Sequence, residues 1–228
     1  MPMASFSGQS DGVHGLDAPV AFMLENLQPK VVDRARKAAR VIFGRAGAPK
    51  DLITVHIRWG DKYKESPRTA IDTYVAAVDR LLADRPRHPS REVPIFVVTE
   101  DYTALEAFQQ AVVLREGWVV YTHPAAILQA SRGADAPTGE KRKKNEKKHK
   151  HKPKRRDELS PVDFARRSSG ALGLESLVSL ILALEARSYV LTIASNWGRL
   201  IEEARRAAWL PRCGQNCTRM VAVGAPPP

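Results

Sequence analysis

Long apolar runs are missing from this chain of 228 residues. The longest stretch without Asp, Glu, Lys or Arg runs from Gly117 to Ser131 and is interrupted by His123 and Pro124. Because about 20 apolar residues are needed to cross a bilayer, we predict no transmembrane segment in this chain. The opening residues, MPMASFSGQSDGVHG, contain neither a basic segment nor an apolar one. We therefore expect no secretory signal in the chain as written.

Cysteine is also scarce, with Cys213 and Cys217 in the segment CGQNC. A structural zinc site needs four ligands, and no Cys/His partner set accompanies this pair. A local disulfide formed in an oxidising compartment and a pair of free surface thiols both remain open. His149 and His151 alternate with lysines, whose positive charge opposes metal binding. We assign these two histidines no role.

Positive charge is abundant but confined to one place. The net charge is +11, and residues 139–156, GEKRKKNEKKHKHKPKRR, hold eleven Lys or Arg against two Glu, which leaves +2 for the rest of the chain. A segment of like charges without apolar residues cannot offset the entropy of ordering. We therefore predict a disordered basic insertion at 131–160, a disordered tail at 1–18, and a single domain over 19–225.

Apolar strands alternate with amphipathic helices along the body of the chain. The pattern predicts strands at 52–60, 93–101, 117–123 and 188–195, and helices at 71–84, 102–113, 172–187 and 196–209. Two further helical segments precede the first strand, at 21–27 and 31–44. Continuous apolar strands indicate a sheet that is covered on both faces. The predicted fold class is therefore α/β, a Rossmann-like three-layer domain with a mostly parallel sheet.

Polar clusters follow three of these strands, where ligands bind in parallel sheets. They are HIRWGDKYKE, TED and TIASNWGR. In the first, Arg58 presents a planar fork of donors that suits a phosphate. The alternative is a structural pair with Asp61, and spacing alone favours neither interpretation.

The other two clusters also have two interpretations each. Ser195 and Asn196 join a strand to a helix, so they could cap that helix or border an anion site at its N-terminus. Asp101 and the two residues before it could bind a nucleoside or simply cap the following helix. The residues alone leave these alternatives open.

Two motifs, VHIRWGDK and LTIASNWGRLIEEAR, resemble those of the fucosyltransferase superfamily that includes the α1,6-fucosyltransferases and the protein O-fucosyltransferases. The resemblance spans Leu52 to Ala207 and implies the GDP-fucose-binding half of a two-domain GT-B glycosyltransferase. By this resemblance Arg58 would contact the β-phosphate of GDP-fucose and His56 would support it. Asp61 and Lys62 would orient the loop that follows.

The same resemblance implies further site residues and a reaction. Asp101 would help to hold the nucleoside, and Ser195 with Asn196 would lie near the pyrophosphate. The activity would be an inverting transfer of fucose to a hydroxyl of a glycan or glycoprotein, with Glu65 as the candidate base and Arg58 stabilising the departing GDP. No metal or cofactor is expected, since the chain has no Asp-x-Asp pair.

The chain departs from the α1,6 pattern at two positions near the first motif. Trp59 stands where those enzymes usually have a second Arg, and Ser66 stands where their acidic loop residue lies. About 50 residues precede the motif, too few for a second Rossmann domain. We therefore expect a partial chain that lacks the acceptor domain.

The resemblance places the protein in the Golgi or another secretory lumen, although the chain shows no targeting signal. The rival interpretation is a non-catalytic nucleotide-binding module that acts through its basic insertion on nucleic acid or acidic partners. We rank this second and do not expect a nucleic-acid partner, because no aromatic residue lies between the lysines to stack on bases.

Overall fold

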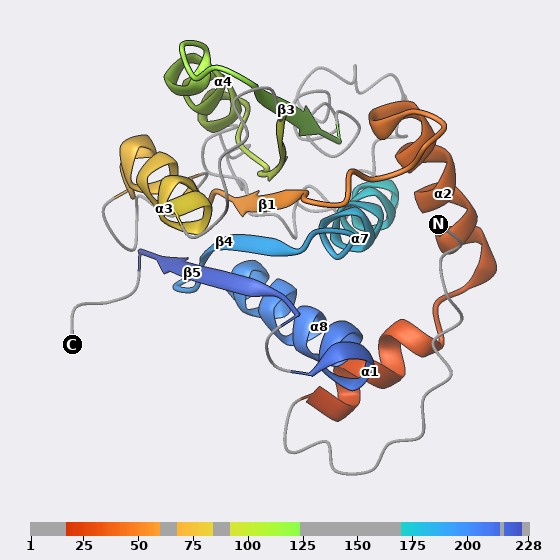
Figure 1. The fold of residues 1–228 in the computed structure, drawn as a ribbon. Helices are drawn as coiled ribbons and strands as arrows, with labels where there is room; N and C mark the ends of the chain where they lie inside the picture. The colour runs from red at the N-terminus through yellow and green to blue at the C-terminus, as the bar shows by residue number, and fades with distance from the viewer. Residues whose placement is uncertain (1–16, 60–67, 84–91, 124–169, 215–216, 225–228) are drawn as a thin grey trace, which may run out of the picture.

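The computed structural model describes residues 17–59, 68–83, 92–123, 170–214 and 217–224. Helices and strands alternate through these residues, as the sequence predicts (Figure 1). In chain order the elements are α1 (Asp17–Glu25), α2 (Pro29–Phe43), β1 (Ile53–His56), α3 (Ile71–Ala83), β2 (Val93–Val98), α4 (Tyr102–Val112), β3 (Trp118–Thr122), α7 (Ala171–Ala183), β4 (Ser188–Thr192), α8 (Asn196–Cys213) and β5 (Arg219–Val223).

The strands form one five-stranded sheet in the order β3-β2-β1-β4-β5. Every neighbouring pair is parallel, and His56 at the end of β1 lies opposite Val98 of β2 and Leu191 of β4. This confirms the α/β, Rossmann-like fold with a parallel sheet. Because all strands run the same way, their carboxyl ends meet at one edge of the sheet.

Helices cover both faces of the sheet, because alternate residues of the same strands are apolar on both sides. Helices α3 and α4 pack on one face, with Ile53 and Val55 of β1 in that core. Helices α7 and α8 pack on the other face, with Tyr189 and Leu191 of β4 in their core. The N-terminal helices extend this second layer, since α2 packs beside α7 and α1 beside α8 (Figure 1).

A buried polar cluster joins α2, α7 and the end of β3. Glu175 of α7 is 2% exposed and pairs with the guanidinium of Arg34 on α2. Its other carboxylate oxygen lies 3.2 Å from Nε2 of His123, and Nδ1 of that histidine lies 2.9 Å from the Ser179 hydroxyl. Burial lowers the pKa of His123, although Glu175 opposes the shift. The cluster fastens the N-terminal helices to the second layer.

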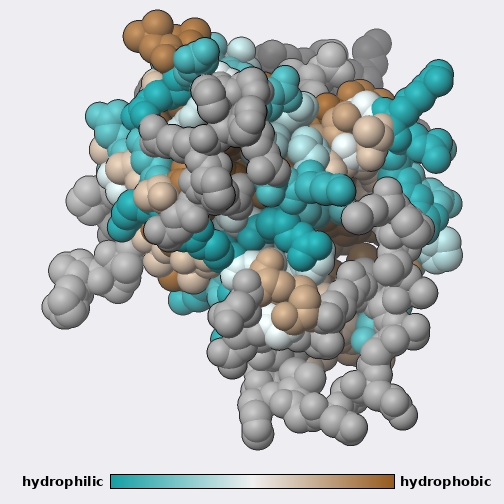
Figure 2. All heavy atoms as spheres, in the orientation of Figure 1, coloured by the Kyte–Doolittle hydropathy of each residue, from teal (hydrophilic) through white to brown (hydrophobic). Residues whose placement is uncertain are grey.

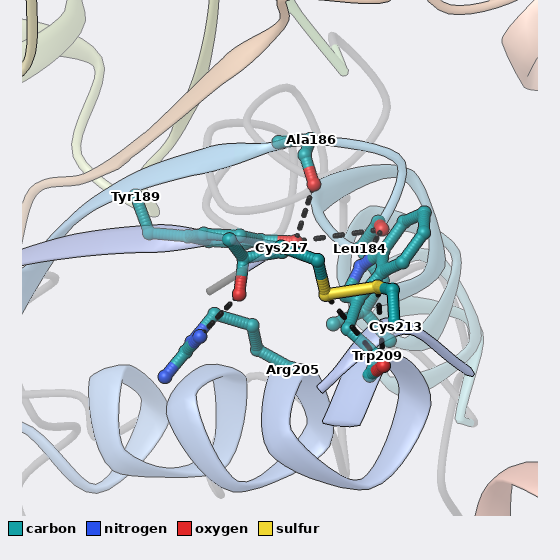
Figure 3. Close-up of a disulfide and its surroundings, with 8 residues drawn as sticks. Leu184, Ala186, Tyr189, Arg205, Trp209, Cys213 and Cys217 are labelled. Atoms are coloured by element: carbon teal, nitrogen blue, oxygen red, sulfur yellow. Dashed lines mark hydrogen bonds between the residues drawn. A yellow bond between two sulfur atoms is a disulfide. The ribbon is translucent and has the colours of Figure 1, made fainter. Parts of the chain in front are cut away.

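The cysteines form a disulfide between Cys213 at the end of α8 and Cys217 just before β5 (Figure 3). Of the two alternatives that the sequence leaves open, the structure shows the disulfide. Nearby, the indole N–H of Trp209 donates to the carbonyl oxygen of Leu184 at 3.0 Å. The disulfide therefore closes the turn from α8 into the edge strand.

The structure differs from the sequence prediction at several points. Strand β5 was not predicted, and α1 begins at Asp17, inside the expected 1–18 tail. The basic insertion predicted at 131–160 lies outside the described residues.

Among the helices of the described part, none is long and apolar enough to cross a membrane. In Figure 2 hydrophilic residues are spread over the part of the face that is not grey, and hydrophobic residues gather at several places, among them the top of the view near α4.

Candidate functional site

The topology predicts a crevice between β1 and β4. The chain leaves β1 to build β2 and β3 on one side, then returns through α7 to place β4 on the other side of β1. In an open parallel sheet, ligands bind at this switch point, beyond the carboxyl ends of the two strands. Arg58 follows β1 at this edge, and helix α8 begins there after β4.

A chain of buried hydroxyl groups links the two strands beneath the crevice. The hydroxyl of Thr192 at the end of β4 donates to the His56 carbonyl oxygen at 3.0 Å. The Tyr74 hydroxyl of α3 lies 2.8 Å from the same Thr192 oxygen. Burial raises the pKa of Tyr74 above its ordinary value. The phenol therefore stays neutral at physiological pH and can serve as a fixed hydrogen-bonding group.

His56 lies beneath the first turn of α8. Its side chain is 3% exposed, and its Nδ1 has no hydrogen-bond partner within the part of the chain that the structure describes. A β-carbon built at Gly198 would stand 3.1 Å from that nitrogen. Burial and the nearby charge of Arg58 lower the pKa of His56 from 6.5 to about 3. The imidazole is therefore neutral at physiological pH.

Arg58 forms an ion pair with Glu100, which follows β2. The Arg58 side chain is 15% exposed, whereas that of Glu100 is 42% exposed. The guanidinium of Arg58 is thus largely buried, and the ion pair joins the ends of β1 and β2. Asp61, the partner that the sequence offered for Arg58, lies outside the described residues.

Asp101 is the N-cap of α4. Its Oδ1 accepts hydrogen bonds from the backbone N–H of Thr103 at 2.9 Å and of Ala104 at 3.3 Å, and from the Thr103 hydroxyl at 2.6 Å. Its own N–H donates to the Thr99 hydroxyl oxygen at 3.1 Å. The structure therefore shows the capping role that the sequence offered as one alternative. Its predicted role in nucleoside binding stays a prediction.

The start of α8 lies on the opposite side of the crevice. Ser195 is buried, and its carbonyl oxygen accepts from the N–H of Arg199 at 3.0 Å. Asn196 is exposed, and its side-chain oxygen accepts from the Arg199 guanidinium. Arg199 is exposed on the first turn of α8, so this helix end carries a cation as well as its own N–H groups.

Trp59 holds together the two ends of the segment that follows β1. Its indole N–H donates to the Thr69 carbonyl oxygen at 2.9 Å, and the Arg68 guanidinium lies 5.4 Å from the centre of its ring. Trp59 therefore has a structural role here. Lys62 and Glu65, predicted in this segment, lie outside the described residues.

Sequence reasoning did not single out Tyr74 or Thr192, and it did not weigh Glu100 as a partner for Arg58. Tyr74 is a polar group on the apolar side of an amphipathic helix, and Thr192 lies at the end of an apolar strand. These positions were the only available signal. Within the described residues, no group of three or more His, Cys, Asp or Glu could hold a metal ion.

Comparisons with known proteins show only a distant likeness of fold, to solved structures. No protein-family model matches the chain, and no curated protein matches it. Among solved structures, the α1,6-fucosyltransferase NodZ, co-crystallised with GDP, is similar with a TM-score of 0.38 and 13% identity. The match covers 77% of this chain and 41% of the NodZ chain. A likeness at this level is too distant to indicate what the chain binds or does.

Proposed function

We propose that this chain is the nucleotide-sugar-binding part of a GDP-fucose-dependent fucosyltransferase. The observation that carries the proposal is the position of Arg58, a largely buried cation after the central strand β1. Helix α8 begins after the adjacent strand β4, so its N–H groups and the guanidinium border one crevice. Both features favour an anion, and in this proposal the diphosphate contacts both.

The choice of GDP-fucose among nucleotide sugars rests on the two sequence motifs. VHIRWGDK provides His56 and Arg58 at the end of β1, and TIASNWGR provides Ser195 and Asn196 before α8. These motifs are about 135 residues apart and come to adjacent strands. The nucleoside would extend toward β2, where Glu100 and Asp101 follow the strand.

The proposed reaction is an inverting displacement at the anomeric carbon of fucose. A hydroxyl of the acceptor attacks that carbon, the bond from carbon to the β-phosphate oxygen breaks, and GDP leaves with the bonding electrons. Arg58 and the N–H groups of α8 stabilise the charge that develops on the diphosphate. Glu65 takes the proton of the acceptor hydroxyl in this proposal.

The acceptor is part of the proposal too, as a glycan or glycoprotein hydroxyl. We also propose that the protein works in a secretory compartment. The disulfide between Cys213 and Cys217 supports this location, since such bonds persist in oxidising environments.

A thermal-shift series with GDP, UDP and ADP tests the donor assignment on the full chain. A ligand that binds only the folded state stabilises it by about 2.7 kcal/mol at 100 times its Kd. We expect GDP to raise Tm by several degrees, and UDP and ADP to raise it less. Equal shifts from all three nucleotides, or none from GDP, would contradict the assignment.

A further inference from the structure

We propose that Glu100 is a displaceable counter-ion, which holds Arg58 in the empty site and gives way to the diphosphate of the ligand. This inference rests on the proposed function, since it assigns a role in nucleotide binding to a residue outside both sequence motifs. Glu100 follows β2, and Arg58 follows β1, so the pair bridges the two neighbouring strands at their carboxyl ends.

Burial explains why Arg58 needs such a partner. Its side chain is 15% exposed, and a cation that is removed from water is costly without an opposite charge. Asp101, the other described carboxylate after β2, is engaged at the N-terminus of α4, where its Oδ1 accepts from Thr103 and Ala104. Glu100 is a carboxylate after β2 that pairs with the guanidinium and offsets this cost.

The exposure of the two side chains differs in a way that permits exchange. Glu100 is 42% exposed, so its carboxylate can turn into water and recover hydration there. The guanidinium is held at the end of the central strand and has less room to follow. An incoming phosphate can thus take over the N–H groups that Glu100 contacts, while Arg58 stays in place.

The exchange makes binding depend on the charge of the ligand. If Glu100 remained beside Arg58, a diphosphate would meet a carboxylate of like charge, so the ion pair must open before the phosphate binds. A ligand without phosphate, such as guanosine, cannot replace the lost pair. Glu100 therefore competes with a diphosphate for Arg58 and leaves the affinity for neutral nucleosides unchanged.

Isothermal titration with GDP on the full chain tests this role. Glu100→Gln keeps the side-chain size but removes its charge, so we expect GDP to bind about three- to tenfold more tightly. Guanosine should bind the variant and the wild type alike. Glu106→Gln, an exposed residue of α4, makes the same change of net charge and should alter the GDP affinity less than about twofold.

A second pair of variants shows whether the effect acts through Arg58. The Arg58→Gln variant has already lost the ion pair. Adding Glu100→Gln to it should therefore change its GDP affinity by less than about twofold. An equal gain in both backgrounds, or an equal gain from Glu106→Gln, would mean a general charge effect and overturn the inference.

The remaining outcomes separate the inference from the proposed function. If the wild type binds GDP and Glu100→Gln binds it equally or more weakly, Glu100 is not a displaceable counter-ion, and the proposed function stands. If neither protein binds GDP, the donor assignment fails and the inference fails with it.

Discussion

Gly198, in the first turn of α8, lies so close to the end of β4 that a β-carbon there would stand 2.1 Å from the Thr192 carbonyl oxygen. It would also stand 3.1 Å from Nδ1 of His56. The backbone of β4 cannot move aside as a flexible side chain would. Because Gly198 has no side chain, the N-terminus of α8 can lie close to the ends of β1 and β4.

Gly198→Ala should move the first turn of α8 and destabilise the fold. Overpacking of this kind costs about 1–3 kcal/mol, which corresponds to a Tm lower by roughly 2–10 °C for a chain of this size. Differential scanning calorimetry gives the change.

Gly173→Ala is the matched control, because no atom lies within 4 Å of the added carbon on α7. Alanine is the better helix former, so we expect this control to raise the stability by up to about 1 kcal/mol. Equal stability of the Gly198→Ala variant and the wild type would show that the close approach is not a constraint.

Acid should destabilise the fold through His56. Its pKa is lowered from 6.5 to about 3 in the folded state, so between these values the unfolded chain binds the proton more readily. The free energy of unfolding should therefore fall as the pH drops from about 6.5 toward 3. Protonation of His56 alone should raise the unfolding equilibrium constant by up to about tenfold per pH unit.

Urea denaturation at several pH values, on the wild type and on His56→Asn, isolates this contribution. The variant should lose less stability than the wild type over the same pH range. Parallel pH profiles would mean that His56 does not couple protonation to folding. His123, whose pKa burial also lowers, should leave part of the acid sensitivity in the variant.

The layered fold could be predicted from the sequence because its signals are local. The cores of β1, β2 and β4 are runs of apolar, mostly β-branched residues, and the helices between them show a 3.6-residue period. Strand β5 was missed because its segment is short and begins with Arg219 and Met220. It becomes a strand by pairing with β4, which is a tertiary effect.

The details of the site could not be predicted, since they depend on the direction of side chains at strand ends. Glu100 and Asp101 are adjacent in sequence and both carry a carboxylate. The residues alone left open whether Asp101 caps a helix or binds a nucleoside. The structure shows the cap and pairs Glu100 with Arg58, and the role of Asp101 in nucleoside binding stays a prediction. Glu175 and Ser179 carried a signal, because they lie four residues apart on an apolar helix.

Arg34→Met should destabilise the fold, because Glu175 is 2% exposed and would lose its cation. Breaking a fully buried ion pair costs about 3 kcal/mol or more. Because the Arg34 side chain is 51% exposed, solvent screens this pair and we expect a loss of about 1–3 kcal/mol. In the control Arg36→Met, the partner Asp33 is exposed, and we expect a cost below about 1 kcal/mol. Urea denaturation compares the two variants, and equal losses would contradict the role of the buried cluster.

Reduction of the disulfide should lower the stability modestly. It closes a loop between residues four apart, and a loop of this size is worth about 2 kcal/mol in the chain-entropy model. A melting curve with and without a phosphine reductant measures the effect. The double variant Cys213→Ser/Cys217→Ser should be insensitive to the reductant, and an unchanged wild-type curve under verified reduction would contradict the prediction.

Isothermal titration of GDP into the wild type, Arg58→Ala and Arg58→Lys tests the proposed site most directly. A charge-assisted hydrogen bond is worth about 1.5–3 kcal/mol, so Arg58→Ala should weaken binding roughly ten- to a hundredfold, and Arg58→Lys should recover part of the loss. Arg115→Ala is the matched control, because Arg115 pairs with Asp79 before β3, at the other edge of the sheet. It should leave the affinity within about twofold. If both Arg58 variants bind GDP as the wild type does, the crevice between β1 and β4 is not the diphosphate site.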